Sequence, residues 1–139
     1  MKVKDVMHSG VTWVNPATPV AQIAKTMREQ DIGAIPVGEN DRLVGMVTDR
    51  DIVCRGLANG RDAQKLTARD VMSKGISYCR DDDDLDDAIE SMSQKHIRRL
   101  TVIDDDKRMV GMLSLGDISR KADKQHCVEF LQAVSAHHA

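Results

Sequence analysis

The chain has 139 residues, a formal net charge of −2 and 41% hydrophobic residues, of which only three are aromatic. This near-neutral balance argues against a general nucleic-acid-binding protein, which would carry an excess of Lys and Arg. No apolar run is long enough to cross a bilayer, and the first ten residues lack the apolar stretch of a signal peptide. We therefore expect a cytoplasmic protein that binds neither nucleic acid nor a membrane.

The sequence contains two copies of one unit. KDVM at residues 4–7 matches RDVM at 69–72 with an offset of 65 positions, and after one inserted residue 42–52 matches 108–118 with an offset of 66. Such ordered similarity indicates an internal duplication. The predicted organisation is a first repeat at 1–58, a linker at 59–66, a second repeat at 67–123, and a C-terminal helix and tail at 124–139.

The first repeat begins with VTWV at 11–14, a β-prone run that predicts a short strand. A helix follows, with Thr18 as a plausible cap, because apolar residues recur at the spacing of one helical face: Val20, Ile23, Ala24 and Met27. Two apolar runs at 34–37 and 43–48 then predict strands, and a second helix is expected from Asp49.

The second repeat has the same order of elements. ISYC at 76–79 predicts its first strand, and the helical face that follows carries Leu85, Ala88, Ile89 and Met92. Strands are expected at 99–103 and 109–114, a second helix near Leu115, and a further short helix at 127–134.

Each repeat is therefore expected to be β-α-β-β-α. A unit of about 55 residues can hardly bury its own sheet and helices, so the two repeats should share their burial. The predicted fold class is α/β (α+β), with two repeats packed sheet to sheet about a pseudo-two-fold axis.

The duplicated segments end in a polar pair. Thr48 and Ser114 close the last strand of their repeats, and Asp51 and Asp117 follow three residues later. One interpretation is structural, because a hydroxyl and a carboxylate at this spacing resemble a capping box at a helix start. The other is functional, because a hydroxyl beside free helix N–H groups suits a phosphate, and a carboxylate suits ribose hydroxyls. The spacing alone is compatible with both.

These features resemble a tandem pair of CBS domains (named after cystathionine β-synthase), also called a Bateman module. The resemblance rests on DVM before the first strand, the amphipathic helix, IPV at 35–37, HIRRLTVID at 96–104, and the pattern G-h-x-[T/S]-x-x-D in both repeats. It covers roughly residues 1–123.

The resemblance implies that clefts between the repeats bind adenosine derivatives such as AMP, ADP, ATP, NAD or S-adenosylmethionine. In that family the hydroxyls contact phosphate or ribose, the carboxylates accept ribose hydroxyls, cationic side chains face phosphate, and small residues line the adenine slot. The ligand-binding residues expected on this basis are Thr18, Ile32, Gly33, Ala34, Thr48, Arg50, Asp51, Ile97, Arg98, Arg99, Ser114 and Asp117.

The two clefts should be unequal. We expect phosphate to prefer the cleft built on Ser114 and Asp117, because Arg98 or Arg99 adds positive charge there, whereas the acidic run at 81–84 should border the other cleft.

The expected function is regulatory rather than enzymatic. The sequence shows no nucleophile–base pair, no metal-ligand spacing among its five His and three Cys, and no Gly-rich phosphate loop. We therefore expect no catalytic residue, no metal and no catalytic cofactor. A homodimer that senses a nucleotide and signals to a regulated protein is the main hypothesis. The alternative is a dimeric scaffold protein with non-functional clefts.

Overall fold

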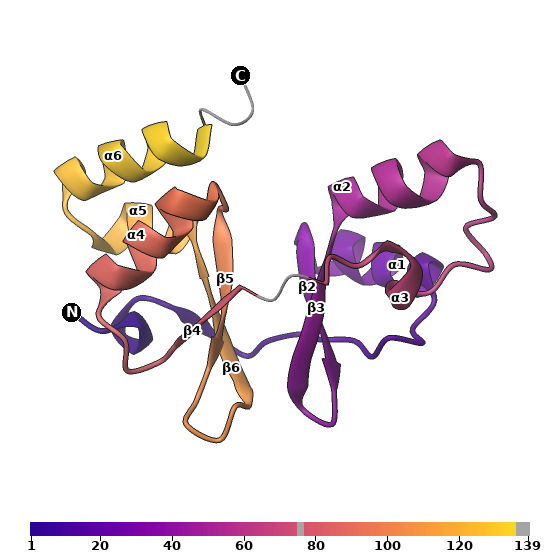
Figure 1. Ribbon diagram of the computed structural model, residues 1–139, viewed down its shortest axis with the longest axis horizontal. Coiled ribbons are helices and arrows are strands. Elements are labelled where there is room, and N and C mark those ends of the chain that lie inside the picture. The colour runs from indigo at the N-terminus through magenta and orange to yellow at the C-terminus, as the bar shows by residue number, and fades with distance from the viewer. Residues whose placement is uncertain (75–76, 136–139) are drawn as a thin grey trace. The chain divides into compact units, whose positions relative to one another are not determined.

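The structure is a computed structural model, and it describes residues 1–74 and 77–135 (Figure 1). The chain forms two compact units. One comprises residues 12–76 and is called the 12–76 unit. The other combines residues 1–11 with residues 77–139 and is called the 77–139 unit. Each unit mixes helices and strands, which confirms the predicted class of two α/β repeats.

The 12–76 unit is built on an antiparallel hairpin of β2 (Ala34–Glu39) and β3 (Arg42–Thr48). Helix α1 (Val20–Gln30) precedes the hairpin. After it, α2 (Asp49–Asp51) continues without a break into a π-helical turn and a 3₁₀ turn that end at Asn59, and α3 (Ala68–Val71) follows. The core consists of aliphatic and Met side chains: Val20, Ile23, Met27, Ile35, Val37, Val47, Leu66, Ala68, Val71 and Met72.

The 77–139 unit contains a four-stranded sheet in the order β1-β6-β5-β4, in which only β4 and β5 run parallel. Its helices α4 and α6 pack against each other (Figure 1). The elements are η1 (Val3–Asp5), β1 (His8–Ser9), β4 (Tyr78–Arg80), α4 (Leu85–Lys95), β5 (Arg99–Ile103), β6 (Met109–Ser114), α5 (Leu115–Lys121) and α6 (Lys124–Ser135). The aliphatic core includes Val3, Val6, Leu85, Ile89, Met92, Leu100, Leu113, Ile118 and Phe130.

The compact units do not coincide with the sequence repeats. Residues 1–11 begin the first repeat, yet they pack in the 77–139 unit, where the Val3 N–H donates to the Asp83 carbonyl at 2.9 Å. The corresponding segment of the second repeat, which includes α3, packs in the 12–76 unit, where the Arg69 N–H donates to the Pro16 carbonyl at 3.0 Å. Each unit therefore takes its opening segment from the other repeat.

Glycine at one strand position in each repeat allows this exchange. A Cβ on Gly111 would lie 2.7 Å from the His8 carbonyl oxygen, and a Cβ on Gly45 would lie 2.9 Å from that of Ser73. Both distances are shorter than any real contact with a Cβ, so only Gly lets the opening segment pair with its strand.

Two local expectations for the first repeat are wrong. VTWV at 11–14 forms no strand, and only Val14 makes an isolated parallel bridge, to Val37. Thr18 does not cap α1, because Pro19 stands at the cap position and the Thr18 hydroxyl donates to Asn15 instead. The matching strand of the second repeat is formed as β4, although residue 76 of the predicted run lies outside the described residues.

The helical periodicity is confirmed in both repeats with one exception. All four predicted residues of α4 are buried. In α1 the first, second and fourth are buried, whereas Ala24 is exposed.

Candidate functional site

The first repeat places its polar pair where β3 meets α2. Thr48 has an extended backbone and ends the strand, and its Oγ1 accepts the Asp51 N–H at 3.1 Å. In return, Asp51 Oδ2 accepts the Thr48 N–H at 2.9 Å. The Asp51 side chain is 14% exposed, and Arg55 Nε lies 3.9 Å from its Oδ1.

The second repeat forms the same pair where β6 meets α5. Ser114 Oγ accepts the Asp117 N–H at 3.2 Å, and Asp117 Oδ2 accepts the Ser114 N–H at 2.9 Å. The Ser114 hydroxyl also donates to Oδ2 at 2.9 Å. The Asp117 side chain is only 5% exposed.

Both pairs are therefore true capping boxes, as the structural interpretation predicts. The chain contains another at α3, where Asp70 Oδ2 accepts the Thr67 N–H at 2.8 Å. A capping box alone is thus no evidence for a ligand, and a functional assignment needs further support.

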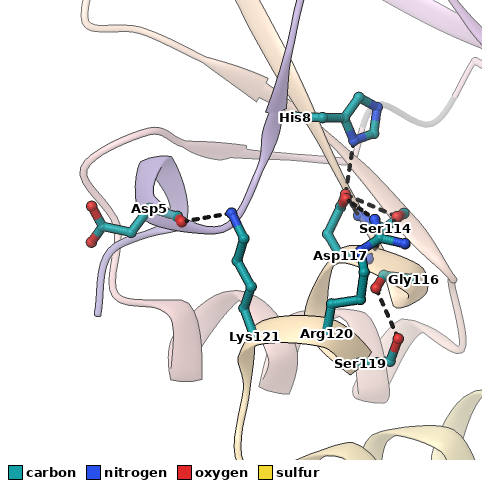
Figure 2. Close-up of polar contacts among 8 residues, drawn as sticks. All are labelled: Asp5, His8, Ser114, Gly116, Asp117, Ser119, Arg120 and Lys121. Carbon is teal, nitrogen blue, oxygen red and sulfur yellow. Dashed lines mark hydrogen bonds and ion pairs between the residues drawn. The ribbon is translucent and has the colours of Figure 1, made fainter.

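Asp117 has two additional partners, which Figure 2 shows. His8 on β1 places Nδ1 2.8 Å from Asp117 Oδ2. From one turn further along α5, Arg120 Nη2 donates to Oδ1 at 3.0 Å. Both oxygens of this carboxylate are therefore bound by other side chains.

These contacts decide the ionisation of Asp117. Burial opposes the charged form, but hydrogen bonds from the Ser114 hydroxyl and the His8 ring outweigh it and lower the pKa of Asp117 below its ordinary value. The carboxylate is consequently ionised at neutral pH, and it acts as a hydrogen-bond acceptor only.

Other predicted site residues lie beside the pair of their own unit. Ala34 stands opposite Thr48 in the β2–β3 register, and the Asp49 N–H donates to the Gly33 carbonyl at 3.0 Å. In the 77–139 unit, Arg99 stands opposite Ser114, and the Arg98 carbonyl accepts the Leu115 N–H at 2.9 Å. The residues at 33–34 and 98–99 are thereby brought to the two strand–helix junctions.

The remaining predicted site residues are Ile32, Ile97, Arg50 and Thr18. Ile32 and Ile97 are partly buried, each against the core of its own unit. Arg50 is exposed on α2. No hydrogen bond in the described part of the chain joins Thr18 to the polar pair of its unit, since its hydroxyl bonds only with Asn15.

His8 and Arg120 are site residues that the sequence did not indicate. His8 lies 109 positions from Asp117 and meets it only because β1 pairs with β6. Arg120 follows Asp117 by three residues, so helical spacing could have signalled that contact.

Nowhere in residues 1–74 and 77–135 do three or more His, Cys, Asp or Glu side chains gather as metal ligands would. Within the same residues, every helix is too short or too polar to cross a membrane.

Comparison with known proteins agrees with this geometry. Residues 3–55 and 68–124 match the CBS domain family. The chain belongs to the CBS domain family. Hypoxic response protein 1 of Mycobacterium tuberculosis is 38% identical to it over 132 residues, which cover 94% of this chain and 92% of that protein.

Two solved CBS structures with bound adenosine compounds resemble this chain. The CBS domain pair of protein MJ0100, in complex with 5'-methylthioadenosine and S-adenosyl-L-methionine, has a TM-score of 0.77 and 27% identity, covering 86% of this chain and 98% of that one. CBSX2 in complex with AMP has a TM-score of 0.75 and 29% identity, covering 87% and 95%.

A third neighbour contains metal. A structure of Hypoxic Response Protein I with two coordinated zinc ions has a TM-score of 0.80 and 38% identity, and it covers 88% of this chain and 100% of that chain. Of these three neighbours, two therefore bind adenosine compounds and the third binds zinc.

Proposed function

We propose that this protein is a regulatory module without catalytic activity that binds an adenosine derivative, of the AMP, ADP, ATP or NAD class, and signals to a partner protein through a shift in conformation. The observation that carries the proposal is the hydroxyl–carboxylate pair at the start of a helix, present in both units of a protein whose relatives bind AMP and S-adenosylmethionine. A ligand can shift the conformation only if its affinity differs between two states.

The proposed contacts follow the chemistry of each group. A carboxylate can accept hydrogen bonds from ribose hydroxyls, and this role falls to Asp51 and Asp117. Free N–H groups at a helix start favour phosphate oxygens. The cationic side chains of Arg50, Arg98 and Arg99 support phosphate, and small or apolar side chains receive the adenine ring, with Ile32, Gly33, Ala34 and Ile97 as its lining and Thr18 as an additional hydroxyl.

A binding screen tests the proposal directly. Thermal unfolding of the purified protein is measured with AMP, ADP, ATP, NAD and S-adenosylmethionine, and with GMP as a control for the base. A ligand present at about 100 times its dissociation constant should add about 2.7 kcal/mol to the free energy of unfolding. No shift with any adenosine compound would leave the alternative, a scaffold protein with non-functional clefts.

The carboxylate assignment is tested by an isosteric change. Asp51→Asn keeps one side-chain oxygen for the Thr48 N–H but replaces the other acceptor by a donor. If Asp51 holds ribose, the loss of a hydrogen bond to a charged acceptor should cost about 1.5–3 kcal/mol, or roughly 10- to 150-fold in affinity. Titration calorimetry with AMP measures this loss.

The capping box at α3 provides a matched control. Asp70→Asn makes the same chemical change in the same local geometry, with Thr67 as the partner, but outside the proposed site. It should lower stability about as much as Asp51→Asn and leave AMP affinity unchanged. Equal affinities for the two variants would show that Asp51 serves only the helix start.

We also propose that the protein acts as a homodimer. Several apolar side chains on helical segments are about half exposed, among them Val53, Leu57, Val128 and Leu131, and a second copy would remove them from water. Sedimentation equilibrium at micromolar concentration should give twice 15.4 kDa, and a clean monomer would contradict the proposal.

A further inference from the structure

We propose that His8 is a specificity-determining residue, which occupies Oδ2 of Asp117 against ligand hydroxyls and leaves Thr48–Asp51 as the pair that binds first. The inference rests on the proposed function and adds a ranking of its two pairs. The two pairs differ in the number of hydrogen-bonding positions that remain free for a ligand.

Most of the hydrogen-bonding positions of the Ser114–Asp117 pair are occupied by groups of its own unit (Figure 2). Asp117 Oδ2 accepts from the Ser114 N–H, the Ser114 hydroxyl and His8 Nδ1, and Oδ1 accepts from Arg120. A carboxylate offers about four acceptor positions, two on each oxygen, so Oδ2 is fully used and Oδ1 keeps one position beside Arg120. The single hydroxyl hydrogen of Ser114 is also committed. A ligand hydroxyl must therefore displace His8 or the Ser114 hydroxyl to reach Oδ2, and one position on Oδ1 is all that is left to it.

The Thr48–Asp51 pair, in contrast, has hydrogen-bonding positions that are free for a ligand. Asp51 Oδ2 accepts only the Thr48 N–H, and the nearest cation to Oδ1 is Arg55 Nε at 3.9 Å, beyond hydrogen-bonding distance. Thr48 Oγ1 accepts the Asp51 N–H, and its own hydrogen is donated to no acceptor among the residues that the structure describes. One carboxylate oxygen and one hydroxyl donor thus remain for a ligand.

The difference follows from two substitutions between the repeats. Ser73 occupies the position of His8, since both bridge to the equivalent Met of their unit, Met46 and Met112. Cys54 occupies the position of Arg120 at the offset of 66. Both units share the capping box at the strand–helix junction, but the helix beyond it differs, since α2 passes into a π-helical turn whereas α5 stays α-helical. The side chains at these two positions therefore act together with the local backbone in deciding which pair keeps free positions.

Charge alone ranks the pairs in the opposite order, because Arg98 and Arg99 belong to the Ser114 unit. Their contribution to a phosphate is a screened surface interaction. Displacing His8 from Asp117 costs an existing hydrogen bond to a carboxylate that is only 5% exposed, although the His8 side chain is 55% exposed. We therefore place the first equivalent of ligand at Thr48–Asp51.

Titration calorimetry with AMP tests the ranking. The wild-type protein should bind one equivalent per chain at least about tenfold more tightly than a second, and Asp51→Asn should remove the tighter phase. His8→Ser, which installs the residue found at the matching position of the second repeat, Ser73, should strengthen the second phase at least about tenfold. This gained phase should persist in the double variant His8→Ser with Asp51→Asn.

His126→Ser is the control, because His126 also lies in the 77–139 unit and bonds an Asp, but on α6. It should change neither phase. Two equal phases in the wild type, or a second phase that His8→Ser leaves unchanged, would overturn the inference while the proposed function stands. Absence of binding by AMP and by every other adenosine compound of the screen, in both the wild type and His8→Ser, would instead refute the proposed function.

Discussion

Among the described residues of the 77–139 unit, two polar side chains are buried, and their surroundings differ sharply. Asp117 has hydrogen-bond partners on both oxygens. Thr101 on β5 is completely buried, and its hydroxyl is the one buried side-chain polar atom in the described residues that lacks a hydrogen-bond partner. An unsatisfied buried hydroxyl costs free energy, so Thr101 is a weak point in this core.

We expect Thr101→Val to stabilise the protein. Valine has nearly the same shape and removes the unpaired hydroxyl, so the free energy of unfolding should rise by about 1 kcal/mol. Urea denaturation measures the change. Thr48→Val is the matched comparison, because it removes a hydroxyl that caps a helix and should lower stability by about 1 kcal/mol. A loss of stability in Thr101→Val would show that the Thr101 hydroxyl has a partner.

At the scale of single elements, the stability of the start of α6 depends on pH. The His126 N–H donates to Asp123 Oδ1 at 2.9 Å, and the His126 ring bonds Oδ2 at 2.6 Å. His126 Nε2 also lies 3.6 Å from Asp86 on α4. The Asp123 hydrogen bond and charge raise the pKa of His126 above its ordinary value of 6.5, and the His126 N–H and ring lower that of Asp123.

These shifts fix the direction of the pH effect. A raised His126 pKa means that its contribution is complete below pH 6.5 and is lost as the pH rises through the folded value. The lowered Asp123 pKa means that the contribution of this carboxylate is lost as the pH falls below its ordinary 3.8. The contact therefore stabilises α6 most between these limits.

We predict that His126→Gln lowers the urea midpoint at pH 5.5 and that the difference from wild type shrinks at pH 8. Glutamine keeps the backbone N–H that caps the helix, so the comparison isolates the ring. A difference that is the same at both pH values would mean that the charge of His126 does not contribute.

At the scale of the whole molecule, the exchange of opening segments links the two repeats. Val6 belongs to the first repeat but is buried in the core of the 77–139 unit, whereas its counterpart Val71 is buried in the core of the 12–76 unit. Neither unit has a complete core without a segment from the other repeat. We therefore expect the folded module to require both repeats.

Val6→Ala and Val71→Ala test this exchange. Each should lower stability by about 2 kcal/mol through a cavity in a packed core. Val6→Ala should reduce hydrogen-exchange protection chiefly in β5, β6 and α4, and Val71→Ala in β2, β3 and α1. Lost protection within the mutated repeat itself would contradict the division into units.

The sequence by itself determined what depends on short spacing. The duplication, the helices α1 and α4, the hairpin strands and the pairs Thr48–Asp51 and Ser114–Asp117 follow from residues a few positions apart. Neighbours at such spacing meet whenever a helix or strand forms, so pattern and contact coincide. The prediction of a strand at 11–14 was wrong. Only Val14 forms a bridge there, to Val37, and that bridge depends on the path of the chain rather than on the local sequence.

Only the tertiary structure decided which segments meet across long separations. The pairing of β1 with β6 brings His8 to Asp117, and α3 completes a core that begins at Val20. No local periodicity records such a contact, because it depends on how distant segments share burial rather than on their own composition. The two pairs are nearly identical in sequence, yet Asp117 has hydrogen-bond donors on both oxygens and Asp51 on one, because the fold places His8 and Arg120 beside Asp117.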